Sequence, residues 1–120
     1  MTVFIFGKTG QLGEELYIQG KERKYKVIGF SHKDLDITNK AEVARMIKKN
    51  KPDVVLNATA YHVVSDCEVH PDKAFLINAI AVRDVAEICE NLNIRFVHYS
   101  TDYVFDGKKG SPYTENDLPS

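Results

Sequence analysis

Three glycines near the amino terminus are spaced as in loops that bind phosphate groups. The stretch GKTGQLG places them at Gly7, Gly10 and Gly13, directly after the apolar run TVFIF. Its first letters, GKT, also match the end of a mononucleotide phosphate loop. That loop needs a further glycine five positions before Gly7, where this sequence has Thr2. The spacing therefore predicts a dinucleotide-binding loop.

Each glycine has a separate physical reason in such a loop. We expect Gly7 to allow a tight turn and Gly10 to let backbone N–H groups approach a pyrophosphate. Gly13 should let the next helix pack closely on the strand. The pyrophosphate would then lie at the amino-terminal end of that helix, where the N–H groups point outward.

Apolar runs alternate with helical periods along the rest of the chain. The patterns predict strands over residues 2–6, 25–31, 54–58 and 95–100, and helices over residues 10–20, 39–50 and 72–91. Such alternation implies parallel strands joined by right-handed crossovers. We expect one domain, residues 1–120, of α/β class. It would be a partial Rossmann-like doubly wound parallel sheet of about four strands, in the order 3-2-1-4, with three main helices.

Helical spacing indicates which side chains of these helices face the core. Leu12 and Leu16 share a face of the first helix, and Val43 and Ile47 share a face of the second. Side chains of residues 36–38 are expected to cap the second helix. The third helix carries the apolar residues Phe75, Leu76, Ala79, Val82, Ala86 and Ile88.

The carboxyl ends of the strands are where ligands of doubly wound sheets bind, at the point where the strand order reverses. Many NAD-binding domains have a carboxylate at the end of the second strand for the ribose 2′-hydroxyl. Here the segment FSHK offers the Ser31 hydroxyl and the Lys33 cation instead. These groups favour NADPH, with its 2′-phosphate, and leave NADH as the alternative.

Composition and charge exclude several other functions. Sixteen basic and seventeen acidic residues nearly cancel, which argues against a nucleic-acid-binding protein. No run of 18 apolar residues and no leader pattern is visible, so we expect a cytoplasmic chain without a membrane partner. His62, Cys67 and His70 lack a fourth ligand for structural zinc, so no metal is expected.

Four stretches in this order resemble one known group of proteins. They are FGKTGQLG, LDIT, NATAY and HYSTDYVFDG. Together they resemble the extended short-chain dehydrogenases/reductases and, within them, the dTDP-4-dehydrorhamnose reductases. The resemblance implies NAD(P)H-dependent reduction of dTDP-4-dehydro-L-rhamnose to dTDP-L-rhamnose, with a dTDP-sugar as the substrate. NATAY favours this branch over sugar-nucleotide epimerases and dehydratases.

The resemblance also implies roles for individual residues. Around the pyrophosphate it places Lys8, Thr9, Gln11 and Leu12. It pairs Asp36 and Ile37 with adenine, and it runs the small segment Ala58, Thr59 and Ala60 past the ribose. Thr101 would be the hydroxyl member of a Ser/Thr-Tyr-Lys triad, next to Asp102 and Tyr103 at the substrate. Asn78 matches an asparagine of the long helix, where a structural role is equally plausible. His62 and Ser65 depart from the family pattern.

The tyrosine and lysine of that triad are expected four residues apart on one helix, in a Y-x-x-x-K motif. Of the six tyrosines only Tyr17 has such a lysine, Lys21, and this pair lies in the first predicted helix. We therefore expect these 120 residues to supply the cofactor-binding portion of a reductase, without turnover of their own.

Two other functions remain open. One is a non-catalytic NADP-binding module similar to the regulatory subunit of methionine adenosyltransferase, which acts through a protein partner. The other is a chain with no binding function. In that last case the fourth strand would form an exposed sheet edge, and a homodimer would be one way of covering it.

Overall fold

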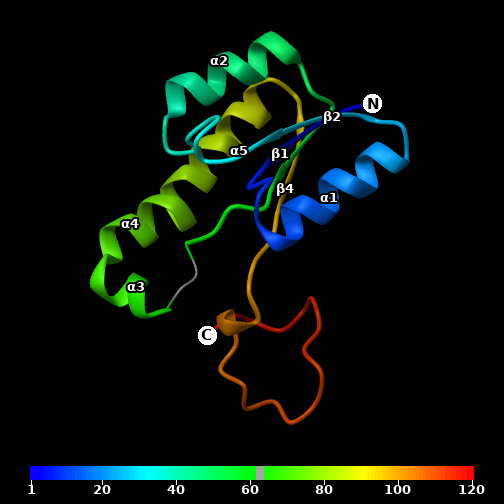
Figure 1. Cartoon of the computed structure of the whole chain (residues 1–120). Coiled ribbons are helices and arrows are strands. Elements are labelled where there is room, and N and C mark those ends of the chain that lie inside the picture. The colour runs from blue at the N-terminus through cyan, green and yellow to red at the C-terminus, as the bar shows by residue number, and fades with distance from the viewer. Residues whose placement is uncertain (62–63) are drawn as a thin grey trace.

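The computed structural model of the chain describes residues 1–61 and 64–120 (Figure 1). Its centre is one sheet of four parallel strands. In chain order the strands are β1 (Thr2–Phe6), β2 (Lys26–Phe30), β3 (Val54–Asn57) and β4 (Arg95–His98). This arrangement confirms the predicted fold class, a Rossmann-like α/β sheet.

Alternate residues of the strands point to opposite faces of the sheet and pack into two separate hydrophobic cores. Phe4 and Phe6 point to one face of the sheet, where Phe30 stacks on Phe6 and meets Phe4 edge-on. Val3 and Ile5 point to the opposite face. Because both faces are buried, β1 needs apolar side chains at every position, and the near-continuous run TVFIF is the result.

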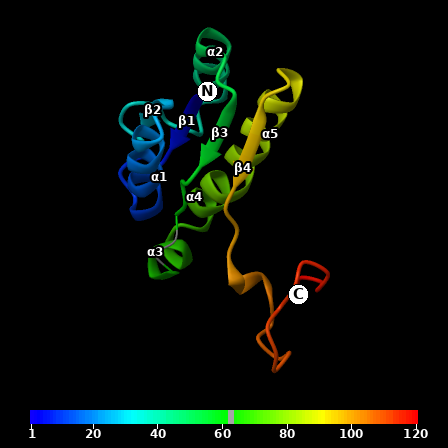
Figure 2. The ribbon, with the colours of Figure 1, turned by 90° about the vertical axis from the view of Figure 1, so that its right-hand side faces the viewer.

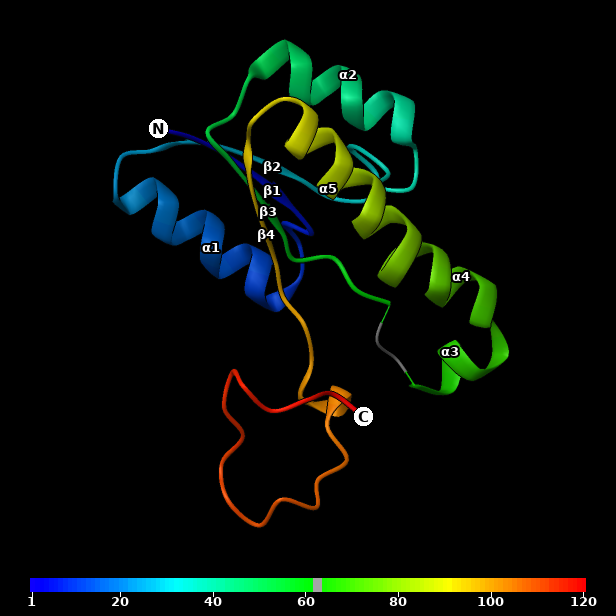
Figure 3. The same cartoon turned by 180° about the vertical axis from the view of Figure 1, so that it is seen from behind.

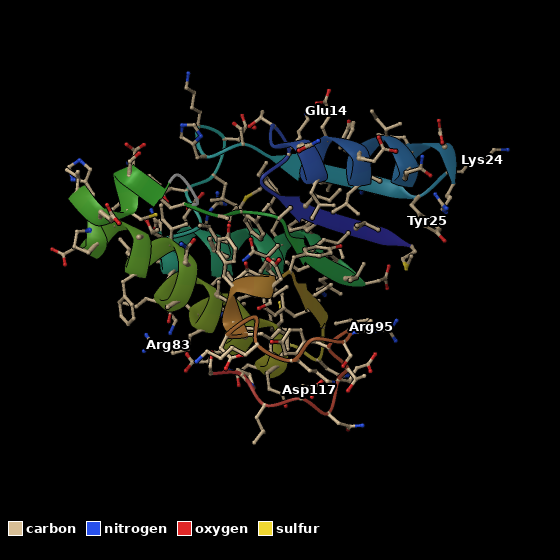
Figure 4. The ribbon with its side chains drawn as sticks, turned by 90° about the horizontal axis from the view of Figure 1, so that it is seen from below. Glu14, Lys24, Tyr25, Arg83, Arg95 and Asp117 are labelled. Carbon is tan, nitrogen blue, oxygen red and sulfur yellow. The ribbon has the colours of Figure 1, made fainter. Side chains whose placement is uncertain are left out.

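Helices cover the two faces unequally. Helix α1 (Gln11–Glu22) packs on the face of Val3 and Ile5, while α2 (Lys40–Asn50) and α5 (Ala81–Asn91) pack side by side on the other (Figures 1 and 2). Seen from below, the labelled Glu14 of α1 and Arg83 of α5 lie on opposite sides of the sheet (Figure 4).

The strand order differs from the predicted 3-2-1-4. The observed order is β2-β1-β3-β4, so the third strand pairs with β1 rather than with β2. From β1 to β2 the chain moves one way across the sheet, and after β2 it crosses back past β1 to form β3. Because both crossovers are right-handed, this change of direction places the second crossover helix on the opposite face. That is why α2 lies opposite α1. An alternating pattern of strands and helices does not reveal this reversal, because either direction satisfies the handedness rule.

The second helix follows its prediction closely. Its cap is Asn39, whose side chain accepts a hydrogen bond from the N–H of Glu42. Residues 36–38, the predicted caps, instead form a turn just before it. Val43 and Ile47 are completely buried, as their spacing indicates.

The long third helix is interrupted, and this was not predicted. It begins with α4 (Pro71–Phe75), continues through a π-helical turn, η1 (Leu76–Ile80), and ends with α5. A short helix, α3 (Val64–Val69), precedes it. The buried face of α5 is formed by Ala81, Val85, Ile88 and Cys89, and burial raises the pKa of the Cys89 thiol to about 11.

Phe75 and Leu76, two apolar residues of the predicted third helix, do not face the core. Their exposed fractions are 63% and 39%. The physical reason is the position of α4, which continues beyond the carboxyl ends of the strands (Figure 3). No sheet lies beneath that part of the helix, so helical spacing there cannot translate into burial.

The last twenty residues form a loop that extends away from the sheet (Figure 2). A short 3₁₀ helix, η2 (Asp102–Val104), opens it. The loop is held by its own contacts: Phe105 stacks on Tyr113, Lys109 pairs with Asp117, and the N–H of Ser120 donates to the carbonyl of Val104. Within the described ranges, no helix combines the length and the apolar character that crossing a membrane requires.

Replacing Ile47 with alanine should lower the free energy of unfolding by about 2–5 kcal/mol, because it leaves a cavity between α2 and the sheet. Chemical denaturation would measure this loss. Ile18→Ala is the matched control, since Ile18 on α1 is 42% exposed. Its cost should stay below about 1 kcal/mol. Equal losses in the two variants would contradict the assignment of the core.

Candidate functional site

The glycine loop lies between the carboxyl ends of β1 and β3. Gly7 has a φ of +83°, and a Cβ there would lie 2.7 Å from the carbonyl carbon and oxygen of Ala58. Only glycine combines this backbone conformation with so close an approach. The sequence argument for a tight turn at Gly7 agrees with this geometry.

A second close approach joins the loop to α1. A Cβ on Gly13 would lie 1.9 Å from the Gly7 carbonyl oxygen, so the helix presses against the loop. Gly10 is different, because its Cβ would be 3.4 Å from that oxygen. The N–H groups of Gly7 and Lys8 both donate to the carbonyl of Phe30, which fixes the loop to the end of β2.

The loop presents free backbone donors to the space above it. Helix α1 begins after Gly10, which has no side chain to cap it. The N–H groups of the first turn of a helix have no intrahelical partners and carry the positive end of the helix dipole. Together they make a site for an anion of the kind that phosphate provides.

A cleft of about 750 Å³ opens at this point. Most of the predicted cofactor residues line it: Gly7, Thr9, Gly10, Gln11, Leu12, Ser31, Asp36, Ile37, Ala58, Thr59 and Ala60. Gly13 lies below the loop, against Gly7. Lys8 and Lys33 are not among the residues that line the cleft.

The side chain of Lys8 lies on the α1 face of β2. Its Nζ is 4.8 Å from the centre of the Tyr17 ring, and its methylene groups pack against Gly29. Lys21 approaches the same ring at 5.6 Å. The Tyr17–Lys21 pair, the one Y-x-x-x-K match in the sequence, is thus part of this packing.

Asp36 and Ile37 both line the cleft, but their side chains make different contacts. The Asp36 carboxylate accepts hydrogen bonds from the N–H of Thr38 at 2.9 Å and from its hydroxyl at 2.7 Å. Ile37 is 6% exposed and packs in the core with Val43 and Ile47. The adenine contacts implied by the family resemblance remain predictions for both residues.

Asn57 fixes the segment that follows β3. It is fully buried, and its Oδ1 accepts from the N–H of Thr59 at 3.0 Å and from the Thr59 hydroxyl at 2.6 Å. Its amide nitrogen faces Nδ1 of His98 at 3.2 Å. Because Oδ1 is already used twice, the amide donates and the ring nitrogen accepts. One side chain therefore joins the ends of β3 and β4.

Asn78 fixes the next part of the same segment. Its Oδ1 accepts from the N–H of Tyr61 and its Nδ2 donates to the Tyr61 carbonyl, both at 2.8 Å. Asn78 lies in the π-helical turn, and such turns are frequent at functional sites. The structure thus gives Asn78 a positioning role for Tyr61.

A second cavity, of about 490 Å³, adjoins the cleft and shares Thr59, Ala60 and Tyr61 with it. Thr101 and Tyr103 line this cavity. The Thr101 hydroxyl accepts a hydrogen bond from the N–H of Tyr103 at 3.2 Å and lies 3.4 Å from the Asp102 carboxylate. Tyr103 is 84% exposed, so it does not belong to the core.

Lys73 of α4 is a cleft residue that the sequence analysis missed. Its Nζ lies 4.9 Å from the centre of the Tyr61 ring, and both side chains line the cleft. The Lys73 ammonium would attract the same kind of ligand as the first turn of α1, which favours an anion. No spacing rule marks Lys73, since only the fold brings α4 opposite the glycine loop.

The residues considered for zinc are not all described. His62 lies outside the described residues, and the Cys67 thiol donates to the Tyr61 carbonyl at 3.1 Å. Elsewhere in the part of the chain that the structure describes, no group of three His, Cys, Asp or Glu side chains is placed to hold a metal ion.

The fold and the site together define a doubly wound α/β protein with a glycine loop where its strand order reverses. The family described as "RmlD substrate binding domain" matches residues 1–120, and the chain belongs to that family. This bears out the resemblance to dTDP-4-dehydrorhamnose reductases.

Individual relatives agree with this family. The spore coat polysaccharide biosynthesis protein SpsK of Bacillus subtilis is 40% identical over 96% of this chain and 41% of its own length. A crystal structure of a dTDP-4-dehydrorhamnose reductase from Clostridium acetobutylicum has a TM-score of 0.94 and 40% identity. It is matched over 100% of this chain and 43% of the other.

A third relative was solved with a ligand. It is the dTDP-4-dehydrorhamnose reductase of Bacillus anthracis in complex with NADP, with a TM-score of 0.92 and 36% identity. The match covers 98% of this chain and 42% of that one. The chain thus spans about two fifths of the length of the relatives it matches.

Gly13→Ala should lower the melting temperature, because its methyl group would overlap the Gly7 carbonyl and push α1 away from the loop. Steric strain of this kind costs about 1–3 kcal/mol. Gly10→Ala is the matched control, since its methyl group meets ordinary contacts, and its melting temperature should stay close to the wild type. A thermal melt followed by circular dichroism would compare them. If Gly10→Ala were the more damaging variant, the assigned contact would be wrong.

Proposed function

We propose that this chain binds NADPH, with NADH as the alternative, and forms the cofactor-binding part of a keto-sugar reductase. The reaction of that reductase would be the reduction of dTDP-4-dehydro-L-rhamnose to dTDP-L-rhamnose. The observation that carries the proposal is the continuity of the two cavities. The cleft over the glycine loop joins, at residues 59–61, the cavity that holds Thr101.

The residues of the cleft fit a dinucleotide. The first turn of α1 offers N–H groups to a pyrophosphate, and the absence of side chains at Gly7 and Gly10 lets a ligand approach the backbone. Ala58 and Ala60 keep the end of β3 equally open. The NADP-bound structure of the Bacillus anthracis relative supports this assignment.

In the reductase reaction the cofactor, when bound, supplies a hydride to the sugar carbonyl. The residues of this chain would bind and orient the two reactants. Asn57 and Asn78 hold residues 59–61 where the two cavities meet. The Thr101 hydroxyl accepts from the N–H of Tyr103 and donates to the Asp102 carboxylate at 3.4 Å. It would have to exchange this long bond to donate its one hydrogen to a sugar oxygen in the second cavity.

A reductase also needs a proton donor for the alkoxide that forms at the sugar carbon. The Tyr17–Lys21 pair cannot supply this proton, because it packs beside Lys8 on the α1 face of the sheet. The described residues thus fit cofactor binding and substrate orientation.

Calorimetry with NADPH and an absorbance assay for NADPH oxidation would test the proposal on the same preparation of the 120-residue chain. We expect binding without turnover of dTDP-4-dehydro-L-rhamnose, since the one Y-x-x-x-K match in the sequence, Tyr17–Lys21, packs on the α1 face of the sheet. Absence of binding would refute the proposed cofactor site. Measurable NADPH oxidation would contradict the assignment as a cofactor-binding part. Tight NADP binding by a longer protein that contains this chain, without keto-sugar turnover, would favour the regulatory alternative.

Removing the positive charge of Lys73 should weaken the binding of both NADPH and NADH. Lys73→Gln is expected to raise the Kd for NADPH by about 3- to 10-fold, because a charged hydrogen-bond donor to phosphate is lost. Lys49→Gln removes the same charge from the exposed last turn of α2, far from the cleft, and should leave the Kd unchanged. Titration calorimetry gives both values. A similar small effect of the two variants would exclude Lys73 from the site.

A further inference from the structure

The end of β2 carries a carboxylate that the sequence order conceals. Ser31 is the first residue after β2, and Asp34 folds back onto it. Asp34 Oδ2 accepts from the N–H of Ser31 at 2.9 Å and from the Ser31 hydroxyl at 3.0 Å. The N–H of Asp34 returns a bond to the Ser31 carbonyl at 3.1 Å, which closes the turn.

This turn lies at the end of the second strand, where doubly wound folds bind the adenosine ribose. Ser31 and His32 line the cleft, next to Leu35 and Asp36. At the end of the second strand a carboxylate selects the ribose 2′-hydroxyl of NADH, whereas cations and hydroxyl groups accept the 2′-phosphate of NADPH. The Ser31 hydroxyl and N–H are donors of the kind a 2′-phosphate uses, and both already bond to Asp34.

We propose that Asp34 is a specificity-determining residue, which lowers the affinity for NADPH relative to NADH. The inference rests on the proposed function, since it concerns the same cleft. Two physical effects act together. The carboxylate occupies the two Ser31 donors, and its negative charge repels a phosphate that approaches them.

Positive groups nearby act in the opposite direction. Lys33 is exposed on the same turn, and the Lys8 ammonium is close enough to help lower the pKa of Asp34. The main cause of that lowered pKa is the hydrogen bond from the Ser31 N–H, followed by the bond from its hydroxyl. Asp34 therefore stays charged at neutral pH. The lysines reduce its repulsion of a 2′-phosphate but leave its hydrogen bonds to Ser31 in place.

A purely structural role for Asp34 predicts something different. If Asp34 only closed the turn, its replacement would loosen residues 31–34 and weaken NADPH and NADH alike. A role in selectivity changes the ratio of the two affinities. The ratio is insensitive to a general loss of stability, so it separates the two roles.

The test compares Asp34→Asn with the wild-type chain. Asparagine keeps one oxygen that can accept from Ser31 and removes the charge. Calorimetry would give the Kd for NADPH and for NADH, with adenosine 2′,5′-bisphosphate and AMP as smaller probes of the same site. We expect the ratio of the NADH Kd to the NADPH Kd to rise by roughly 5- to 30-fold, the range expected when one repulsive charge is removed near a partly exposed phosphate.

Asp36→Asn is the control, because it removes the same charge two residues away, from a side chain that lines the cleft. Asp36 bonds to Thr38 rather than to Ser31, so both dinucleotides should respond alike and the ratio should stay within about 2-fold, well below the effect expected at Asp34. An unchanged ratio in Asp34→Asn, with both dinucleotides bound by the wild type, would overturn this inference alone. Binding of neither dinucleotide by the wild type would overturn the proposed function and the inference with it.

Discussion

The closest backbone contacts in this protein are the ones on which its site depends. Three segments meet at Gly7: the end of β1, the first turn of α1 and the start of the segment after β3. A Cβ at Gly7 would overlap Ala58, and a Cβ at Gly13 would overlap the Gly7 carbonyl. Because neither position has a side chain, α1 can point its free N–H groups into the space between β1 and β3. The cleft exists because these backbones approach so closely.

Polar side chains then determine the shape of the cleft's far wall. Asn57 and Asn78 have different places in the fold, one at the end of β3 and one in the π-helical turn. Both bond to the short segment between Thr59 and Tyr61. This segment is shared by the two cavities. A buried amide such as Asn57 has a large desolvation cost if its partners are lost, so these bonds hold the wall in one position.

Charge at the cleft comes from different segments of the chain. Lys73 lines it from α4, while the Asp34 carboxylate bonds to Ser31, which lines it at the end of β2. Lys8 belongs to the glycine loop itself, yet its side chain packs on Tyr17 at the face of the sheet that α1 covers. The charge that a phosphate would meet therefore depends on side-chain directions as much as on the composition of the loop.

The sequence by itself determined the fold class, the extents of the strands to within two residues and the place of the glycine loop. These features follow from local rules: buried strands need continuous apolar residues, and close backbone approach needs glycine. Tertiary structure alone decided the strand order, the exposure of Phe75 and the direction of Lys8. It also decided the meeting of Lys73 with Tyr61. The strand order and this meeting depend on which segments become neighbours after the chain reverses beyond β2, and no local pattern records that reversal.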